Sequence, residues 1–185
     1  MLYDLARADT RLKWLVTCLL ATFGVAYLFG GWMVALYAGF TPANVARTYA
    51  EPAAAAPEST MMVEHPMQMN EFDAADTTET HLVDIKLLVQ DTHVHVPMYG
   101  VIAAMLSLVV LGLGGSRRAG FTLITLLFAA PWLDFAGMWL TKLASPGFAV
   151  LTVAGGWAMG LGYTVVTVLA LRRMWLMPKE ERTVQ

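Results

Sequence analysis

Four long apolar runs are the feature of this sequence that most restricts its fold. They lie near residues 14–37, 96–114, 120–141 and 147–171. Each is long enough to cross about 30 Å of hydrocarbon as a helix that rises about 1.5 Å per residue. Because lipid offers no hydrogen-bond partners, the backbone inside it must satisfy its own polar groups, and these runs are expected to be helices. Together they predict an all-α fold, an integral membrane four-helix bundle.

The composition excludes most other protein classes. Hydrophobic residues make up 57% of the chain and charged residues 14%, whereas soluble domains carry about 25% charged residues. The single cysteine, Cys18, rules out an internal disulfide and a Cys-x-x-Cys-His site for haem c. The sequence shows no plausible catalytic constellation, and its basic residues merely flank the apolar runs. Neither an enzyme nor a nucleic-acid-binding protein is therefore supported.

Lysine and arginine are distributed unequally between the two sides of the predicted membrane. One side holds Arg7, Arg11, Lys13, Arg117, Arg118, Arg172, Arg173, Lys179 and Arg182, and the other holds Arg47, Lys86 and Lys142. The positive-inside rule then places both termini in the cytoplasm, with the long acidic loop on the other side of the membrane.

The predicted topology divides the chain into four parts. They are the N-terminus with the first helix (1–37), a periplasmic loop (38–95), helices two to four (96–171) and a cytoplasmic tail (172–185). Residues 38–92 carry nine acidic and two basic side chains, a net charge of about −7. A capping box at Asp76 and Glu79 predicts a short amphipathic helix in this acidic loop, over 77–90.

The same loop contains candidate ligands for a soft metal. His65, Met67 and Met69 lie within five residues of one another, and copper(I) prefers such thioether and imidazole donors. Methionine is also an ordinary apolar filler that could lie against the membrane. The sequence leaves both interpretations open.

Every histidine of the chain falls on the outer side: His65, His81, His93 and His95. None lies in the middle of a predicted span, which argues against a haem b held by two histidines on facing helices. His81, His93 and His95 are nevertheless candidate cofactor ligands at the mouth of the bundle, with haem b or copper as the candidate cofactors. The cofactor itself is not identified by the sequence.

The conformation of residues 93–96 decides what His93 and His95 can do together. In an extended segment the two imidazoles project from the same side and can chelate one metal, with Asp91 fixing the tautomer from behind. In a helix they diverge by about 200°, and only one faces the bundle. Pro97 favours the extended alternative because it disfavours helical angles at the preceding residue.

Asp134 is the one charged residue within a predicted span. A carboxylate near mid-span costs roughly 2.5–3.5 kcal/mol on insertion scales, so we expect it to face the interior and to have a partner. His93, His95 and Lys142 are the candidate partners. The arrangement could fasten two helices, complete a metal or haem site with His93 and His95, or handle protons or a quinol.

The fourth run contains a Gly-x-x-x-Gly pair, Gly156 and Gly160, beside Gly155 and Gly162. Small residues let helix backbones approach closely, so the pair is expected to pack inside the bundle, with a subunit contact as the alternative. Trp157 is likewise expected to pack between helices.

Several short motifs resemble a family of small four-span bacterial inner-membrane proteins without an established activity. They are 39–49 (GFTPANVARTY), 92–95 (THVH), 132–140 (WLDFAGMWL, similar to the family's Leu-Asp-Ile-x-x-Trp-Trp) and 155–160 (GGWAMG, similar to Gly-Gly-x-x-Met-Gly). The resemblance covers most of the chain. It implies a location in a bacterial inner membrane and suggests a place alongside cytochromes. The sequence departs from the family in its longer Met/His insert, 53–71.

Two functions are compatible with these patterns. The first is an accessory subunit of a respiratory or other electron-transfer complex, with membrane lipid and other subunits as partners. The second is a non-catalytic structural or assembly protein whose acidic loop docks a basic partner such as a cytochrome. A small transporter is a weaker alternative, because the spans contain few polar side chains beyond Asp134.

Overall fold

The protein is described here by a computed structural model covering residues 3–50 and 83–176. Within these ranges it contains helices and no strand. The helices are α1 (Thr10–Tyr37), α2 (Pro42–Tyr49), α3 (Ile85–Leu113), α4 (Arg117–Leu143), the 3-10 turn η1 (Pro146–Phe148), α5 (Ala149–Leu171) and the π-helical η2 (Arg172–Leu176). Four helical segments are long and apolar enough to span a membrane. The predicted all-α four-helix membrane bundle is confirmed.

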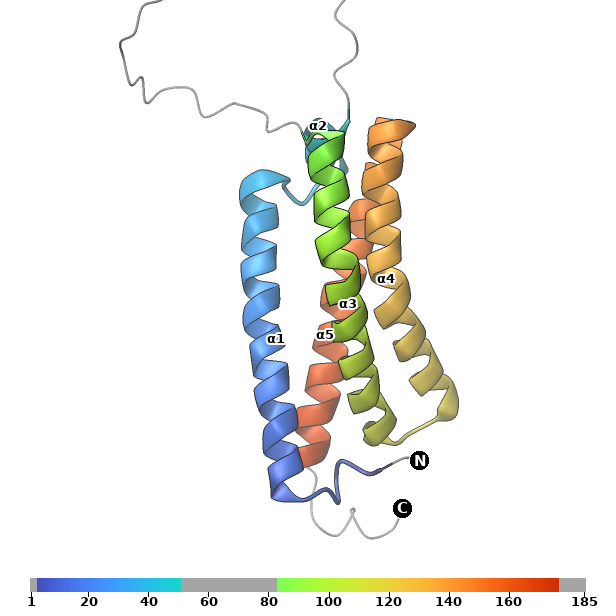
Figure 1. Cartoon of the computed structure of the whole chain (residues 1–185). Helices are drawn as coiled ribbons and strands as arrows, with labels where there is room; N and C mark the ends of the chain where they lie inside the picture. The colour runs from blue at the N-terminus through green and yellow to red at the C-terminus, as the bar shows by residue number, and fades with distance from the viewer. Residues whose placement is uncertain (1–2, 51–82, 177–185) are drawn as a thin grey trace, which may run out of the picture.

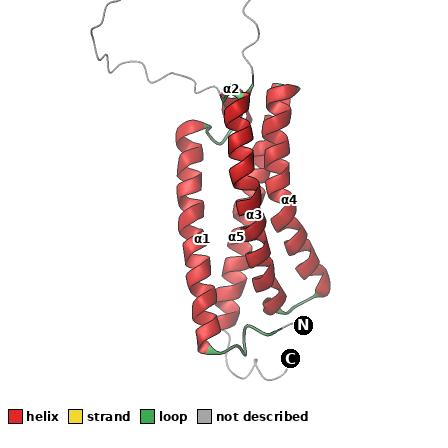
Figure 2. Ribbon diagram, viewed as in Figure 1, coloured by secondary structure: helices red, strands yellow, loops and turns green. Residues whose placement is uncertain are grey.

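The four long helices run side by side, alternately up and down (Figures 1 and 2). We call the end that carries α2 the outer end, following the orientation predicted from the charges, and the opposite end the inner end. The start of α1 meets η2, which follows α5, at the inner end, where Trp14 lies edge-to-face against Trp175 at 6.0 Å.

The second span differs from the prediction at its beginning. It was expected to start at residue 96, but α3 begins at Ile85 and continues through Pro97. Asp84 caps the helix by accepting a hydrogen bond from the Ile85 amide at 2.6 Å. The expectation of a separate amphipathic helix over 77–90 is therefore wrong for residues 85–90, which form the first turns of α3. Residues 77–82 lie outside the described part of the chain.

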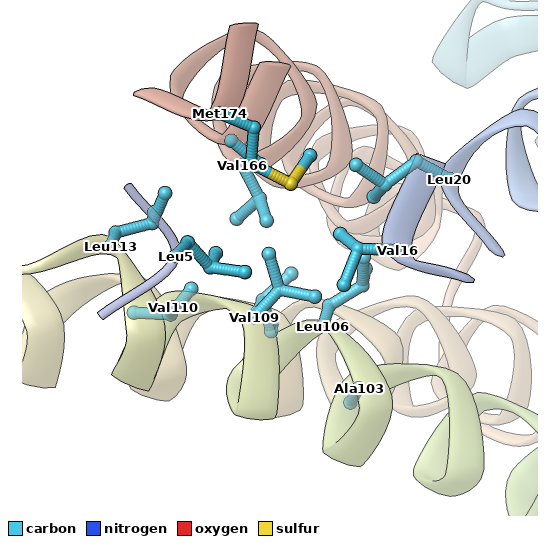
Figure 3. Close-up of a cluster of buried hydrophobic side chains, with 12 residues drawn as sticks. Leu5, Val16, Leu20, Ala103, Leu106, Val109, Val110, Leu113, Val166 and Met174 are labelled. Carbon is cyan, nitrogen blue, oxygen red and sulfur yellow. The ribbon is translucent and has the colours of Figure 1, made fainter. Parts of the chain in front are cut away.

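The main core lies towards the inner end, where side chains of α1, α3, α4 and α5 meet (Figure 3). The segment before α1 closes this end. Leu5 is completely buried, its amide donates to the Gly112 carbonyl at 2.9 Å, and the Asp4 carboxylate pairs with Arg173 at 3.2 Å. The N-terminal segment is thereby fastened to both α3 and η2.

The closest helix pair is α4 and α5, and two glycines permit the approach. A Cβ atom added at Gly155 would lie 2.5 Å from the Asp134 amide nitrogen and 2.8 Å from its Cα. A Cβ at Gly137 would collide with the backbone of Thr152. Small residues at a contact of this kind let two helix backbones touch.

The glycines singled out by the sequence motif occupy a different face. No atom lies within 4 Å of a Cβ added at Gly156 or Gly160. Trp157, expected to pack between helices, is 68% exposed, with the ring of Phe40 as a neighbour at 6.4 Å. Both expectations were wrong. The close contact with α4 is made by Gly155, one residue before Gly156, so that Gly156 and Trp157 face away from α4.

The first span is only loosely joined to the bundle in its outer half. Near its middle, Tyr27 stacks on Tyr163 at 4.7 Å, and the Tyr163 hydroxyl donates to the Leu20 carbonyl at 2.7 Å. Beyond that contact its large side chains, such as Phe29, Trp32 and Met33, are mostly exposed. Figure 1 shows α1 standing apart from α3 over this stretch.

Candidate functional site

Five titratable side chains gather towards the outer end of the bundle. We call them the outer cluster: Tyr49 from α2, Asp91, His95 and Tyr99 from α3, and Asp134 from α4. The three α3 residues are four positions apart and therefore follow one face of the helix. Such a stripe places titratable groups over about 12 Å of depth, from the outer end towards the middle of the membrane.

The imidazole of His95 is fixed by Asp91, one turn earlier in α3. Its Nδ1 lies 2.9 Å from both the carboxylate Oδ1 and the main-chain oxygen of Asp91. Since a carbonyl oxygen can only accept, Nδ1 carries a proton and donates it. The neutral ring therefore keeps its lone pair on Nε2, where it can accept a second proton.

Both members of this pair are accessible from outside. The side chains of His95 and Asp91 are 43% and 40% exposed. An ion pair of this kind contributes little to stability, about 0–1 kcal/mol. The contact therefore adds little to the stability of α3.

The two histidines of the His-x-His motif do not act together. Residues 93–96 are helical, so His93 is turned about 200° from His95 and is exposed. Among the described residues, no group of three or more His, Cys, Asp or Glu side chains is placed to hold a metal ion. The helical alternative therefore holds, and His93, His95 and Asp134 do not form a three-residue metal group.

Asp134 lies where α4 and α5 come closest. Its backbone faces Gly155, and its carbonyl oxygen accepts a hydrogen bond from Thr152 Oγ1 at 3.4 Å. Asp134, Asp91 and His95 are within electrostatic reach of one another. Within the described chain, however, the Asp134 carboxylate makes no hydrogen bond or ion pair with His93 or His95. The carboxylate of Asp134 and the imidazole of His95 therefore lie in the same cluster without a direct bond between them.

Tyr49 covers the outer cluster from α2. The α2 helix is capped by Thr41, and the Thr48 carbonyl accepts from the Val83 amide at 2.9 Å, which ties α2 to the start of α3. Burial, and then the negative charges of Asp91 and Asp134, raise the pKa of Tyr49 to about 12. The phenol consequently stays protonated in the physiological range and can serve as a hydrogen-bond donor.

The raised pKa of Tyr49 predicts a loss of stability at alkaline pH. The group has a pKa of 10.0 when unperturbed, so its contribution is complete below pH 10 and is lost as the pH rises towards 12. We expect the free energy of unfolding of the wild type, relative to Tyr49→Phe, to fall by about 1 kcal/mol per pH unit above pH 10. Unfolding in detergent micelles at pH 9, 10 and 11 measures this difference. Equal pH dependence in the two proteins would contradict it.

Apolar side chains pack beside the outer cluster. Leu88, Phe135 and Met138 are buried together, with Val96, Tyr99 and Trp139 packed against them. The Trp139 indole donates to Thr92 Oγ1 at 3.0 Å, and this bond joins α4 to α3 beside His95. The ring of Tyr99 lies 5.9 Å from that of His95 and 5.9 Å from that of Phe135.

Sequence reasoning found part of this arrangement. It named His93, His95, Asp91 and Asp134, but it did not include Tyr49 or Tyr99. The spacing 91, 95, 99 contains the signal for Tyr99, and it becomes visible once α3 is known to begin before Pro97. The candidate ligands His65, Met67, Met69 and His81 lie outside the described residues.

Comparison with known proteins places the chain among membrane domains. Residues 39–181 match the Aq_1264_TM family, which is described as a transmembrane helical domain. This range contains every residue of the outer cluster and begins after the end of α1. No curated protein and no solved structure matches the chain.

Proposed function

On the premise that the chain belongs to the Aq_1264_TM family of transmembrane helical domains, we propose that it is an accessory subunit of a membrane electron-transfer complex. The outer cluster would hold protons and exchange them with the periplasm in a bacterial inner membrane. The observation that carries the proposal is the hydrogen bond from His95 to Asp91, placed directly above Tyr99. Electron transfer through lipid-soluble carriers needs such an acceptor, because their oxidation releases protons.

This function assigns His95 a different role from that of a metal ligand. A two-histidine chelate would need both imidazoles on one side, whereas His93 faces away from the stripe. A single imidazole with a fixed tautomer and a nearby carboxylate is the arrangement of a general base. The support for His95 as a proton acceptor is therefore stronger than the support for copper or haem at His93 and His95.

The test uses membranes of the source bacterium without the chain, restored with the wild type, His95→Gln or His93→Gln. We expect loss of the chain to lower quinol-linked reduction of an added acceptor. Since a positioned general base contributes about 10²–10⁴-fold, His95→Gln should lower the rate at least 10-fold and alter its pH profile. His93→Gln is the matched control and should leave both unchanged. Unchanged electron transfer in membranes without the chain would overturn the proposal.

The alternative is a structural or assembly protein. It is favoured by the exposed outer half of α1, which presents Phe29, Trp32 and Met33 for another subunit, and by the acidic loop predicted to attract a basic partner. Under this alternative, membranes without the chain lose the assembled complex, while His95→Gln restores it fully. Binding of the partner would also weaken steeply with salt.

A further inference from the structure

A cavity of about 240 Å³ lies between α3 and α4, next to the outer cluster. Its walls include Tyr99 and Gly100 from α3 and Phe128, Trp132 and Phe135 from α4. These residues are near the middle of two helices that are long and apolar enough to span a membrane. The cavity is therefore expected to be reached from the lipid.

The size and the walls of the cavity suit a single flat ring. An engineered apolar cavity of about 150 Å³ admits one benzene molecule, so 240 Å³ leaves room for ring substituents. Aromatic walls favour a ring, since they can stack on its face or meet its edge. Phe128 and Trp132 are 40% and 64% exposed, which puts the mouth at the lipid-facing surface, where an apolar tail can leave.

Two of the residues that line the cavity carry hydrogen-bond donors. Tyr99 contributes a hydroxyl and Trp132 an indole N–H, and both groups can donate to a ring oxygen. Tyr99 is also the neighbour of His95, whose Nδ1 is bonded to Asp91. A ligand in the cavity is thus separated by one side chain from the proton-holding part of the outer cluster.

We propose that this cavity binds the head ring of a lipid-soluble quinol or quinone. The ring would lie between Gly100 and the aromatic side chains of α4, with an oxygen towards Tyr99 and the isoprenoid tail in the membrane. This inference deepens the proposed function and rests on it for its biological meaning. The binding itself requires only the isolated chain.

The test fills the cavity without disturbing the fold. No atom lies within 4 Å of a Cβ added at Gly100, so Gly100→Leu inserts a side chain into the cavity wall and also removes a glycine from a helix. Gly156→Leu is the matched control, because Gly156 has the same open surroundings on α5 and is not among the residues that line the cavity. Both variants are purified as the full chain in detergent and checked for helix content.

The probes are decylubiquinone and menaquinone-4, followed by tryptophan fluorescence quenching, with decylbenzene as a competitor that lacks ring oxygens. An azido-ubiquinone identifies the labelled peptide. We expect saturable quenching by at least one quinone and labelling within 96–103 or 128–135. Gly100→Leu should weaken binding at least 10-fold, Tyr99→Phe about 5-fold, corresponding to one lost hydrogen bond, and Gly156→Leu not at all.

Two results would overturn the inference. One is quenching that does not saturate, or that is equal in the wild type and Gly100→Leu. The other is displacement by decylbenzene as effective as displacement by unlabelled quinone, since the site would then recognise only apolar volume. If the isolated chain binds no quinone but membranes without the chain still lose electron transfer, the accessory role stands and only the binding site is refuted. Saturable binding without any effect in membranes would refute the accessory role and keep the binding site.

Discussion

Gly155→Ala should be among the most damaging single substitutions in the membrane-spanning part of this protein. The added methyl group would lie 2.5 Å from the backbone nitrogen of Asp134, and backbone atoms cannot rotate out of the way as a side chain can. Overpacking of this kind costs typically 1–3 kcal/mol. We expect the upper end of that range, about 3 kcal/mol, measured as free energy of unfolding in mixed detergent micelles.

A matched control separates the clash from the intrinsic effect of replacing glycine in a helix. Gly156→Ala makes the same chemical change one residue along the same helix, where no atom lies within 4 Å of the new Cβ. Alanine is favoured over glycine in helices by about 1 kcal/mol, so Gly156→Ala should be neutral or stabilising. Equal stabilities of the two variants would show that α4 and α5 do not touch at Gly155.

Gly155→Ala should also affect the outer cluster. If the helices separate at this point, Asp134 moves with α4, and its distance from His95 changes. We therefore expect the pH profile of electron transfer to change in Gly155→Ala and to remain that of the wild type in Gly156→Ala. This readout links the helix contact to the site without altering any titratable group.

Leu5→Ala is expected to have the second large effect, at the opposite end of the molecule. Leu5 is completely buried among side chains of α1, α3 and α5 although it precedes the first span. Removing a buried leucine side chain costs about 2–5 kcal/mol through the lost burial and the cavity left behind. We expect a loss of about 3 kcal/mol in free energy of unfolding.

Leu15→Ala provides the comparison for this prediction. Leu15 lies on α1 and is 65% exposed, so in the membrane its side chain meets lipid that is as apolar as leucine itself. Its replacement should change stability by less than about 1 kcal/mol. A Leu5→Ala variant as stable as Leu15→Ala would mean that the N-terminal segment is not fastened beneath the bundle.

The spans were predictable because their signal is contained in each run by itself. Length and the absence of charge identify a membrane helix without knowledge of its neighbours. The start of α3 was harder to predict, because Pro97 indicates a boundary in the local sequence. In the structure the helix nevertheless continues through Pro97. Membrane helices tolerate proline because neighbouring helices and local adjustments satisfy the backbone groups that it frees. The cap at Asp84 marks the actual beginning.

The composition of the site could be predicted only in part. Asp134 was identifiable because a carboxylate in an apolar run is costly wherever it lies. Tyr49 and Tyr99 carried no such signal, since tyrosines are common in and near spans. Their place in the outer cluster depends on how α2 packs against α5 and α4 at the outer end and on the rotation of α3 about its axis. The same dependence on rotation explains why Gly156 was expected at a contact that Gly155 makes.

The loose attachment of α1 gives the protein a modular construction. All five side chains of the outer cluster and every wall of the cavity come from α2 to α4, and α5 supports them through Gly155 and Thr152. The family match likewise starts at residue 39, after α1 has ended. The surface of the first span can therefore change to suit different neighbours in the membrane without altering any residue of the outer cluster or of the cavity.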